Sequence, residues 1–228
     1  MDDVVLITPP AMEPVTLTQV KSYAKIFTTA DDAYISGIVI PAARQAIEDE
    51  LRQVLITQTW TLKRDGFPGF DPRYESFGYP TILVPKPPFQ AINSFTYVDV
   101  AGVTQTLYQC NSDGTTPTID GVEQYYGYQL DPGSETQPAR LIPPWARPWP
   151  PSRRIPMSVQ VEFVAGYGPS SDSPPVWISG GIPMPIINAI LLEASHLYYN
   201  RDAIVATEGK ELARGVSSLL SRYVNHIA

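Results

Sequence analysis

Proline is the feature that most constrains how this chain can fold, because its 228 residues include 24 prolines. A proline inside a helix removes a hydrogen bond and clashes with the preceding turn, and in a sheet it is confined to edges and bulges. Most of the prolines lie between residues 66 and 185. That stretch is therefore predicted to form short strands and ordered loops, with the helices at the two ends of the chain.

Two helices are predicted near the start, after an extended leader over residues 1–14. Thr16 and Gln19 have the spacing of a capping box, which predicts a short helix over about 17–27. The apolar face of this helix is predicted to hold Val20, Ala24 and Phe27.

The second helix is predicted to begin at the acidic pair Asp31–Asp32, which suits the positive end of a helix dipole, and to end near Leu51. Pro41 lies inside this helix and leaves the Gly37 carbonyl without its usual donor, so a kink is expected there. Helical spacing predicts a buried stripe made of Ile35, Ile38, Val39, Ala42, Ala46, Ile47 and Leu51.

From residue 54 the pattern changes to alternation of apolar and polar residues, which is typical of strands. A hairpin turn is predicted at Ala101–Gly102. The predicted strands cover about 57–64, 82–84, 92–100, 103–108, 125–130, 139–142 and 158–165.

Helical spacing returns over about 183–200 and again over about 210–226. The predicted fold class is α+β, with a four-helix unit built from both ends of the chain around a β-rich insertion. The predicted segments are 1–53 (leader and two helices), 54–182 (β-rich insertion) and 183–228 (two helices that complete the unit), all within one structural domain.

Composition and charge exclude several classes of protein. Apolar residues make up 43% of the chain and charged residues 17%, so a buried core is expected and global disorder is excluded. The net charge of −7 comes without a basic stripe, which argues against sequence-specific nucleic-acid binding. No apolar run reaches the roughly 18 residues of a membrane helix, and the acidic start at Met1 predicts no signal peptide.

Residues able to carry chemistry are few. His196, His226 and Cys110 are the only histidines and the only cysteine, and their spacing predicts no metal site, no cofactor and no nucleophilic catalysis. An acidic hydrolase stays an alternative to turn chemistry on a solvated surface. The carboxylates that such a hydrolase would use are Asp65, Asp71, Glu75, Asp99 and Asp113.

One basic and aromatic cluster surrounds the prolines of residues 143–151. Its tryptophans could cover a hydrophobic edge, or the cluster could contact a protein, since Trp and Arg are enriched at interface hot spots. A platform for single-stranded nucleic acid is a third interpretation. The members of this candidate interface loop are Arg140, Trp145, Arg147, Trp149, Arg153 and Arg154.

The order of short segments along nearly the whole chain, from about 14 to 224, carries a family resemblance. These segments are Pro14–Leu17, Asp31–Ile35, Leu55–Trp60, Ile92–Asp99, Val161–Gly168, Pro183–Pro185, Tyr199–Arg201 and Gly215–Tyr223. In this order they resemble the head–tail connector (adaptor) proteins of long-tailed double-stranded DNA phages and prophages. Pro41 and the long loops at 66–80 and 111–137 depart from that family's pattern.

The resemblance implies a structural, non-enzymatic role in the neck of a virion, with the host cytoplasm as the place of assembly. Such proteins form a ring, typically of twelve subunits, between the portal protein and the stopper or tail-completion protein. Double-stranded DNA passes through the ring without sequence-specific binding. The resemblance implies that the C-terminal residues Tyr223, Val224, His226 and Ile227 contact the portal, although Tyr223 could equally complete the core of the last helix.

A second function stays open from the sequence. The chain could be another neck, tail or baseplate protein whose aromatic loops contact a protein or a glycan. Trp145, Trp149 and the tyrosines at 125, 126 and 128 are the residues that suggest it.

Overall fold

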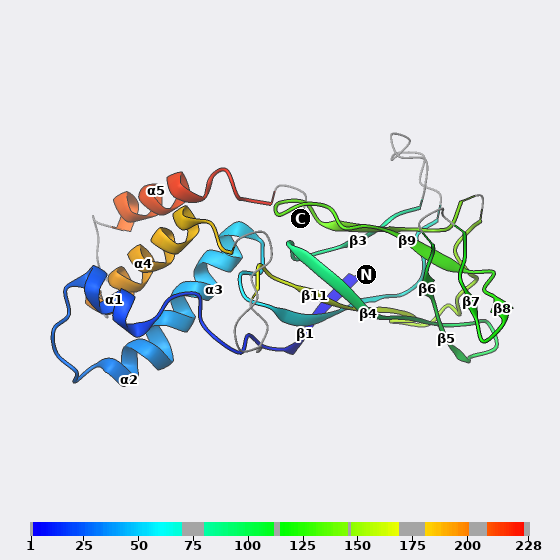
Figure 1. Ribbon diagram of the computed structural model, residues 1–228, viewed down its shortest axis with the longest axis horizontal. Helices are drawn as coiled ribbons and strands as arrows, with labels where there is room; N and C mark the ends of the chain where they lie inside the picture. Colours follow the sequence, from blue (N-terminus) through cyan, green and yellow to red (C-terminus); the bar gives the residue numbers. More distant parts are fainter. Residues whose placement is uncertain are drawn as a thin grey trace. The chain divides into compact units, whose positions relative to one another are not determined.

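The computed structural model describes residues 2–69, 80–111, 115–145, 147–168, 181–200 and 209–225, with side chains for all of these except 209–214. The chain divides into two compact units. Residues 2–9 and 58–165 form the β unit, and residues 10–57 and 166–225 form the helical unit (Figure 1). The predicted α+β class is confirmed, and the helices from both ends of the sequence share one unit. The prediction of one structural domain over the whole chain stays a prediction.

Helix α1 (Leu17–Ala24) begins at the predicted capping box. The Gln19 N–H donates to the Thr16 side chain at 3.2 Å, and the Thr16 N–H donates to the Gln19 side chain at 2.8 Å. The helix ends earlier than predicted because Lys25 adopts a left-handed conformation, with φ 55°, and caps it. The prediction that Phe27 lies on this helix with Val20 and Ala24 is therefore wrong: Phe27 follows the end of the helix, and its side chain is 91% exposed.

One continuous helical stretch follows. It consists of α2 (Asp32–Tyr34), η1 (Ile35–Val39) and α3 (Ile40–Leu51). The η1 segment is a π-helical turn, in which the Ile40 N–H donates to the Ile35 carbonyl five residues back. Pro41 has no N–H to donate to the Gly37 carbonyl, so the disturbance expected at this proline takes the form of a π turn.

The π turn changes which apolar residues face the core. Of the predicted stripe, the structure buries Ile35, Val39, Ile47 and Leu51. Ile38 and Ala46 are exposed and Ala42 is half-buried, so the prediction of burial is wrong for the first two. A π turn holds more residues than an α turn, and positions before and after it lose their common phase. The buried face of α3 is made of Ile40, Ala43, Arg44, Ile47, Glu48 and Leu51.

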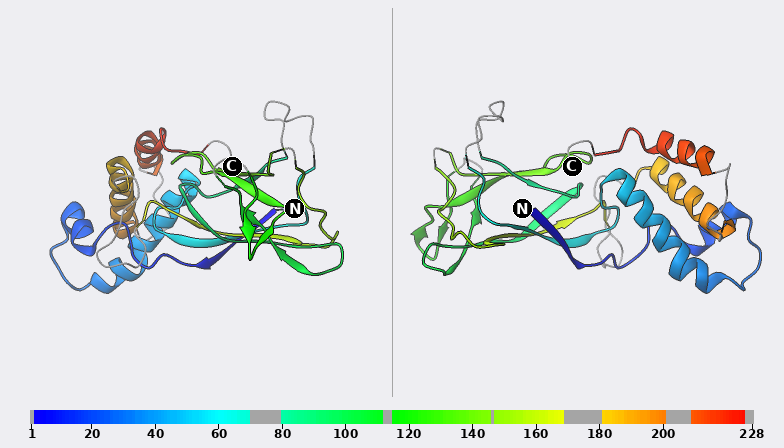
Figure 2. Two further views of the ribbon diagram at one scale, coloured as in Figure 1. Left: turned by 45° about the vertical axis from the view of Figure 1, so that its right-hand side comes forward. Right: turned by 180° about the vertical axis from the view of Figure 1, so that it is seen from behind.

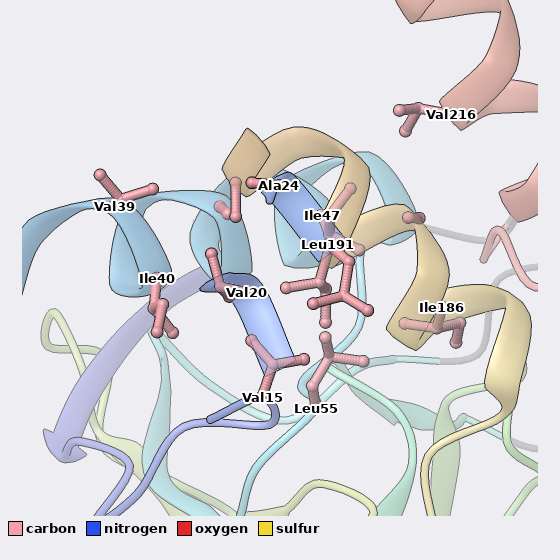
Figure 3. Close-up of a cluster of buried hydrophobic side chains, with 14 of the residues drawn as sticks. Val15, Val20, Ala24, Val39, Ile40, Ile47, Leu55, Ile186, Leu191 and Val216 are labelled. Atoms are coloured by element: carbon pink, nitrogen blue, oxygen red, sulfur yellow. The ribbon is translucent and has the colours of Figure 1, made fainter. Parts of the chain in front are cut away.

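The remaining helices are α4 (Met184–Tyr199) and α5 (Gly209–Leu220), which ends at Leu220 rather than near 226. Helix α4 lies between α3 and α5 (Figure 2) and also contacts α1. Figure 3 shows Val20, Ile47 and Leu191, from segments far apart in the sequence, within one cluster of buried side chains. Apolar burial of this kind is the main favourable term in folding, and α4 supplies much of it.

The β unit contains the strands that the period-two pattern predicts, together with several that it misses. The strands among the described residues are β1 (Asp2–Thr8), β2 (Gln58–Arg64), β3 (Ile82–Val84), β4 (Phe89–Val98), β5 (Thr104–Thr106), β6 (Tyr108–Gln109), β7 (Thr118–Ile119), β8 (Val122–Glu123), β9 (Gly127–Asp131), β10 (Ala139–Ile142) and β11 (Val159–Ala165). The predicted leader is extended, as expected, but most of it is the paired strand β1.

Three sheets are formed, in the orders β1-β2-β11-β4-β5, β3-β10-β9-β6 and β7-β8. The strand pairs are antiparallel except β6 with β9, which is parallel. The predicted hairpin joins β4 to β5, and its turn holds Gly102 at φ 89°. The two larger sheets form two layers (Figure 1), and the rings of Phe95 on β4 and Tyr128 on β9 meet across them at 5.3 Å.

A buried ion pair on α3 organises the helical unit around polar atoms. The Arg44 guanidinium donates to the Glu48 carboxylate at 2.5 Å and to the Glu13 carboxylate at 2.8 Å. The second oxygen of Glu48 accepts the Leu55 N–H at 2.9 Å. Both Arg44 and Glu48 are over 90% buried, so each needs the other to offset the cost of leaving water.

Removal of the Glu48 carboxylate is expected to destabilise the chain strongly. Glu48→Ala leaves the Arg44 charge and the Leu55 N–H without this buried acceptor, which costs about 3–5 kcal/mol of unfolding free energy. Urea denaturation followed by circular dichroism measures this loss. The matched control is Asp49→Ala, an exposed acid one residue away, for which less than about 0.5 kcal/mol is expected. Equal losses in the two variants would contradict the prediction.

Candidate functional site

The carboxylates considered for an acidic hydrolase have structural partners where the structure describes them. Asp65 accepts the Met157 N–H, which holds the pKa of its carboxyl below the usual range. Asp99 accepts from the Gln105 side chain and the Val103 N–H, and these bonds lower its pKa in the same way. Both carboxylates accept hydrogen bonds from nearby loop residues, as turn chemistry predicts. Asp71, Glu75 and Asp113 lie outside the described residues.

The described part of the chain shows neither a candidate metal site nor a candidate membrane-spanning helix. No group of three or more His, Cys, Asp or Glu side chains there could hold a metal ion. Cys110 is a buried thiol. None of the described helices is both long enough and apolar enough to span a membrane.

Trp149 of the candidate interface loop lies inside the β unit. Its indole N–H donates to the Pro80 carbonyl at 2.6 Å, and its ring stacks on Phe67 with 5.1 Å between centroids. A buried tryptophan usually finds such a hydrogen-bond partner. This side chain therefore anchors the proline-rich loop by packing, the first of the three interpretations offered by the sequence.

Arg147 fastens the same loop to the segment that carries the β7–β8 hairpin. Its Nη1 donates to the Thr116 hydroxyl at 3.0 Å and to the Tyr125 carbonyl at 2.9 Å, and its Nη2 pairs with Glu123 at 3.2 Å. The guanidinium also lies 4.8 Å from the centre of the Tyr125 ring. One side chain thus fixes several points on a segment that has little regular structure of its own.

The apolar side chains next to this arginine are exposed. Trp145 is 73% exposed, at a turn closed by the bond from the Arg147 N–H to the Pro144 carbonyl. Tyr125 is 59% exposed, and its ring meets Tyr126 edge to face at 4.8 Å. We call Trp145, Arg147 and Tyr125 the aromatic patch. Large exposed aromatics on a fixed frame are typical of protein-contact surfaces.

The other arginines of the predicted cluster have different surroundings. Arg140 lies on β10 and pairs with Asp131 on the neighbouring strand β9, with 3.0 Å between Nε and Oδ2. Arg153 and Arg154 are exposed. Of the six residues that the sequence groups together, Trp149 is therefore a buried anchor, Arg147 a loop clamp and Arg140 part of a strand–strand ion pair, whereas Trp145, Arg153 and Arg154 are exposed.

An open pocket of about 510 Å³ lies beside the buried anchor and is lined mainly by proline and aromatic side chains. Its charged lining residues are Asp65, Arg147 and Arg154. The first of these accepts the Met157 N–H, and the second holds the loop around Tyr125.

Of the C-terminal residues that the sequence suggests as a portal contact, the structure describes Tyr223 and Val224, which lie at the edge of the helical core. Tyr223 and Val224 are half-buried and pack against that core. The Tyr223 carbonyl accepts the Gln53 side-chain amide, and the Asn225 N–H donates to the Leu51 carbonyl at 3.0 Å. His226 and Ile227 lie outside the described residues.

Gln53 was missed by sequence reasoning because a glutamine next to a helix end carries no pattern. It is fully buried, and its carbonyl oxygen accepts the Tyr167 hydroxyl at 3.2 Å while its amide donates to Tyr223. Its role is visible only in the folded chain, where the Gln53 amide links the segments that carry Tyr167 and Tyr223. No signal in the sequence could have found it.

Comparison with known proteins gives matches in structure alone. No protein-family model matches the chain, and no curated protein does. The fold is similar to a chain in the neck of an empty gene transfer agent (GTA) particle, computed with C6 symmetry (TM-score 0.64, 20% identity, 99% of this chain and 97% of that one). A chain in the virion of a native GTA particle is also similar (TM-score 0.65, 20% identity, 99% and 96%).

A third similar chain belongs to the neck of a native GTA particle computed with C12 symmetry (TM-score 0.57, 18% identity, 98% of this chain and 97% of that one). In all three cases the likeness covers nearly the full length of both chains. The comparisons therefore establish a shared fold that includes both the helical and the β-rich parts.

Loss of the Arg147 side chain is expected to loosen the segment that it holds. Arg147→Ala removes charge-assisted hydrogen bonds to Thr116 and Glu123, so amide exchange in residues 115–125 should quicken by about tenfold or more. Hydrogen–deuterium exchange with mass spectrometry measures this rate. Arg154→Ala, the change of an exposed arginine in the same region, is the matched control and should leave it unchanged.

Arg140 is expected to set the pKa of its partner. Hydrogen bonds from Arg140 are the largest cause of the lowered pKa of Asp131, and the Gly133 N–H adds to them. Arg140→Gln should therefore raise that pKa toward 3.8, which NMR titration of the Asp131 carboxyl would detect. Because the folded-state pKa is below the unfolded one, the stability from this pair is present above the ordinary pKa and is lost as pH falls through the lowered one. An unchanged pKa in the variant would contradict the assignment.

Proposed function

We propose that this chain is a structural protein in the neck of a phage-like particle. The observation that carries the proposal is the full-length fold likeness to chains in GTA necks and virions, together with the segment order that resembles head–tail connectors. Fold alone does not define function, so the proposal rests on the likeness and the segment order together. The absence of a polar constellation able to do chemistry in the described residues is compatible with this role.

In its finer form, the proposal is a head–tail connector (adaptor) ring, typically of twelve subunits, between the portal and the stopper or tail-completion protein. The C6 and C12 symmetry of the similar necks supports repeated copies of one chain around an axis. The protein would reside at the capsid vertex in the virion and in the host cytoplasm during assembly.

Double-stranded DNA would pass through the ring without being held. Each subunit contributes a net charge of −7 and no basic stripe. A wall of this charge repels phosphates, so DNA could slide without the counterion release that drives binding.

Two surfaces are proposed for the partners on either side of the ring. The C-terminal residues Tyr223, Val224, His226 and Ile227 would contact the portal. The aromatic patch in the β unit would contact another neck protein, since Trp, Tyr and Arg dominate interface hot spots. Both assignments are open to alanine substitution in an assembly assay.

The exposed aromatic patch also favours the second candidate function, a neck, tail or baseplate module that binds a protein or a glycan. Capture of a tail protein or a glycan by the isolated chain, without association with portal-bearing heads, would support this alternative. Trp145→Ala should then abolish the capture.

Loss of the protein from its particle should uncouple heads from tails. A lysate produced without this chain is expected to contain filled heads and separate tails, because the ring joins the two. Electron microscopy of the lysate measures the fraction of joined particles, and expression of the wild-type chain in trans is the control. Normal tailed particles in the absence of the chain would sink the proposal.

A further inference from the structure

Two apolar surfaces on the helical unit are exposed in the single chain. The first is the loop between α1 and α2, where Phe27 is 91% exposed, more than any other large apolar side chain among the described residues. Tyr23 on the last turn of α1 is 46% exposed, and Lys25 between them is exposed as well. We call Tyr23, Lys25 and Phe27 the aromatic knob.

The knob stands on a rigid frame. The Tyr199 hydroxyl donates to the Ala24 carbonyl at 2.5 Å, and the Tyr198 hydroxyl donates to the Asp31 carboxylate at 2.8 Å. Lys21 and Asp32 add an ion pair of 2.6 Å across the loop. Both ends of the loop are therefore fixed, and docking of Phe27 would cost little of the ordering entropy that weakens contacts made by mobile loops.

The second surface runs along the exposed side of η1 and α3. Ile38, Ala46 and Asp49 are exposed and Ala42 is half-buried, so these four residues recur on the solvent side of the helical stretch. Ile38 is 58% exposed. We call these four residues the small-residue stripe. Its apolar members Ile38 and Ala46 are exposed, although helical spacing predicts that they are buried.

The two surfaces complement each other in size and charge. The knob presents two large rings and a lysine, whereas the stripe presents an isoleucine, two alanines and, at its far end, a carboxylate. Asp49 lies 17 positions beyond Asp32, near the far end of the helical stretch that begins at the loop. The knob and the stripe are therefore two different patches, as a head-to-tail contact between copies requires.

We propose that the aromatic knob of one copy docks on the small-residue stripe of the next, with Phe27 over Ala46 and Lys25 near Asp49. The occupant of each surface is thus a second copy of this chain. This contact rests on the proposed function, since it supplies the interface by which the ring would close. A heterologous contact of this kind joins two different patches and propagates until the ring is complete.

Cross-linking tests the contact directly. The single native cysteine, Cys110, is buried, so introduced thiols dominate the reaction. The variant Phe27→Cys with Ala46→Cys, in necks isolated from particles, is treated with a short bis-maleimide and run on a denaturing gel. A ladder of covalent oligomers is expected from the double variant, only monomer from either single variant, and only dimer from a mixture of the two singles.

A charge exchange provides a second, independent readout. Lys25→Glu or Asp49→Lys alone should reduce incorporation into necks, and the two together should restore it. Phe27→Ser should reduce incorporation by about tenfold, as expected for loss of a hot-spot residue. The matched control is Val100→Ser, an exposed apolar residue of the β unit that should have no effect.

The outcomes separate this inference from the function on which it rests. Rings in the necks with no ladder and normal incorporation of Phe27→Ser would overturn the contact and leave the neck function intact. Dimers from Phe27→Cys alone would show a two-fold contact and would also overturn it. Particles whose necks lack the wild-type chain would overturn the proposed function itself.

Discussion

The buried ion pair between Glu48 and Arg44 is the interaction on which the rest of the helical unit depends. The Glu48 carboxylate holds Arg44, which in turn holds Glu13, and it accepts the N–H of Leu55 just before the chain enters strand β2. The Leu55 carbonyl then accepts the Tyr167 N–H, directly after strand β11 ends. Within the helical unit, Glu13, Leu55 and Tyr167 therefore make hydrogen bonds close to where the chain passes between the units at 9–10, 57–58 and 165–166.

The same region leaves no room for substitution at Gly166. It has φ 127°, and an added Cβ would lie 2.7 Å from the backbone of Ile56. Close backbone contact is possible there only without a side chain. Buried polar atoms and Gly166 thus hold the chain in the helical unit next to the ends of strands β2 and β11. The two exposed apolar surfaces are also held in place by hydrogen bonds: Arg147 supports the aromatic patch, and Tyr198 and Tyr199 support the aromatic knob.

Sequence patterns predicted most regular elements because the period of the apolar residues survives in the fold. The capping box at Thr16 and strand β10 agree with their predicted bounds. For strand β1 the sequence predicts only an extended leader, because its partner β2 begins some fifty residues later and no local pattern records that pairing. Trp149 and Arg147 looked alike in sequence as interface residues, yet one is a core anchor and the other a loop clamp.

The sequence by itself determined the α+β class, the helical ends around a proline-rich strand region and the scarcity of catalytic groups, since each follows from local periodicity, proline chemistry or composition. Only the tertiary structure decided which side chains are buried. The π turn before Pro41 moved Ile38 and Ala46 into solvent, and the cap at Lys25 left Phe27 exposed. Burial of Arg44, Glu48 and Gln53 became possible because hydrogen-bond partners distant in the sequence offset their desolvation, which is a property of the fold and not of any segment.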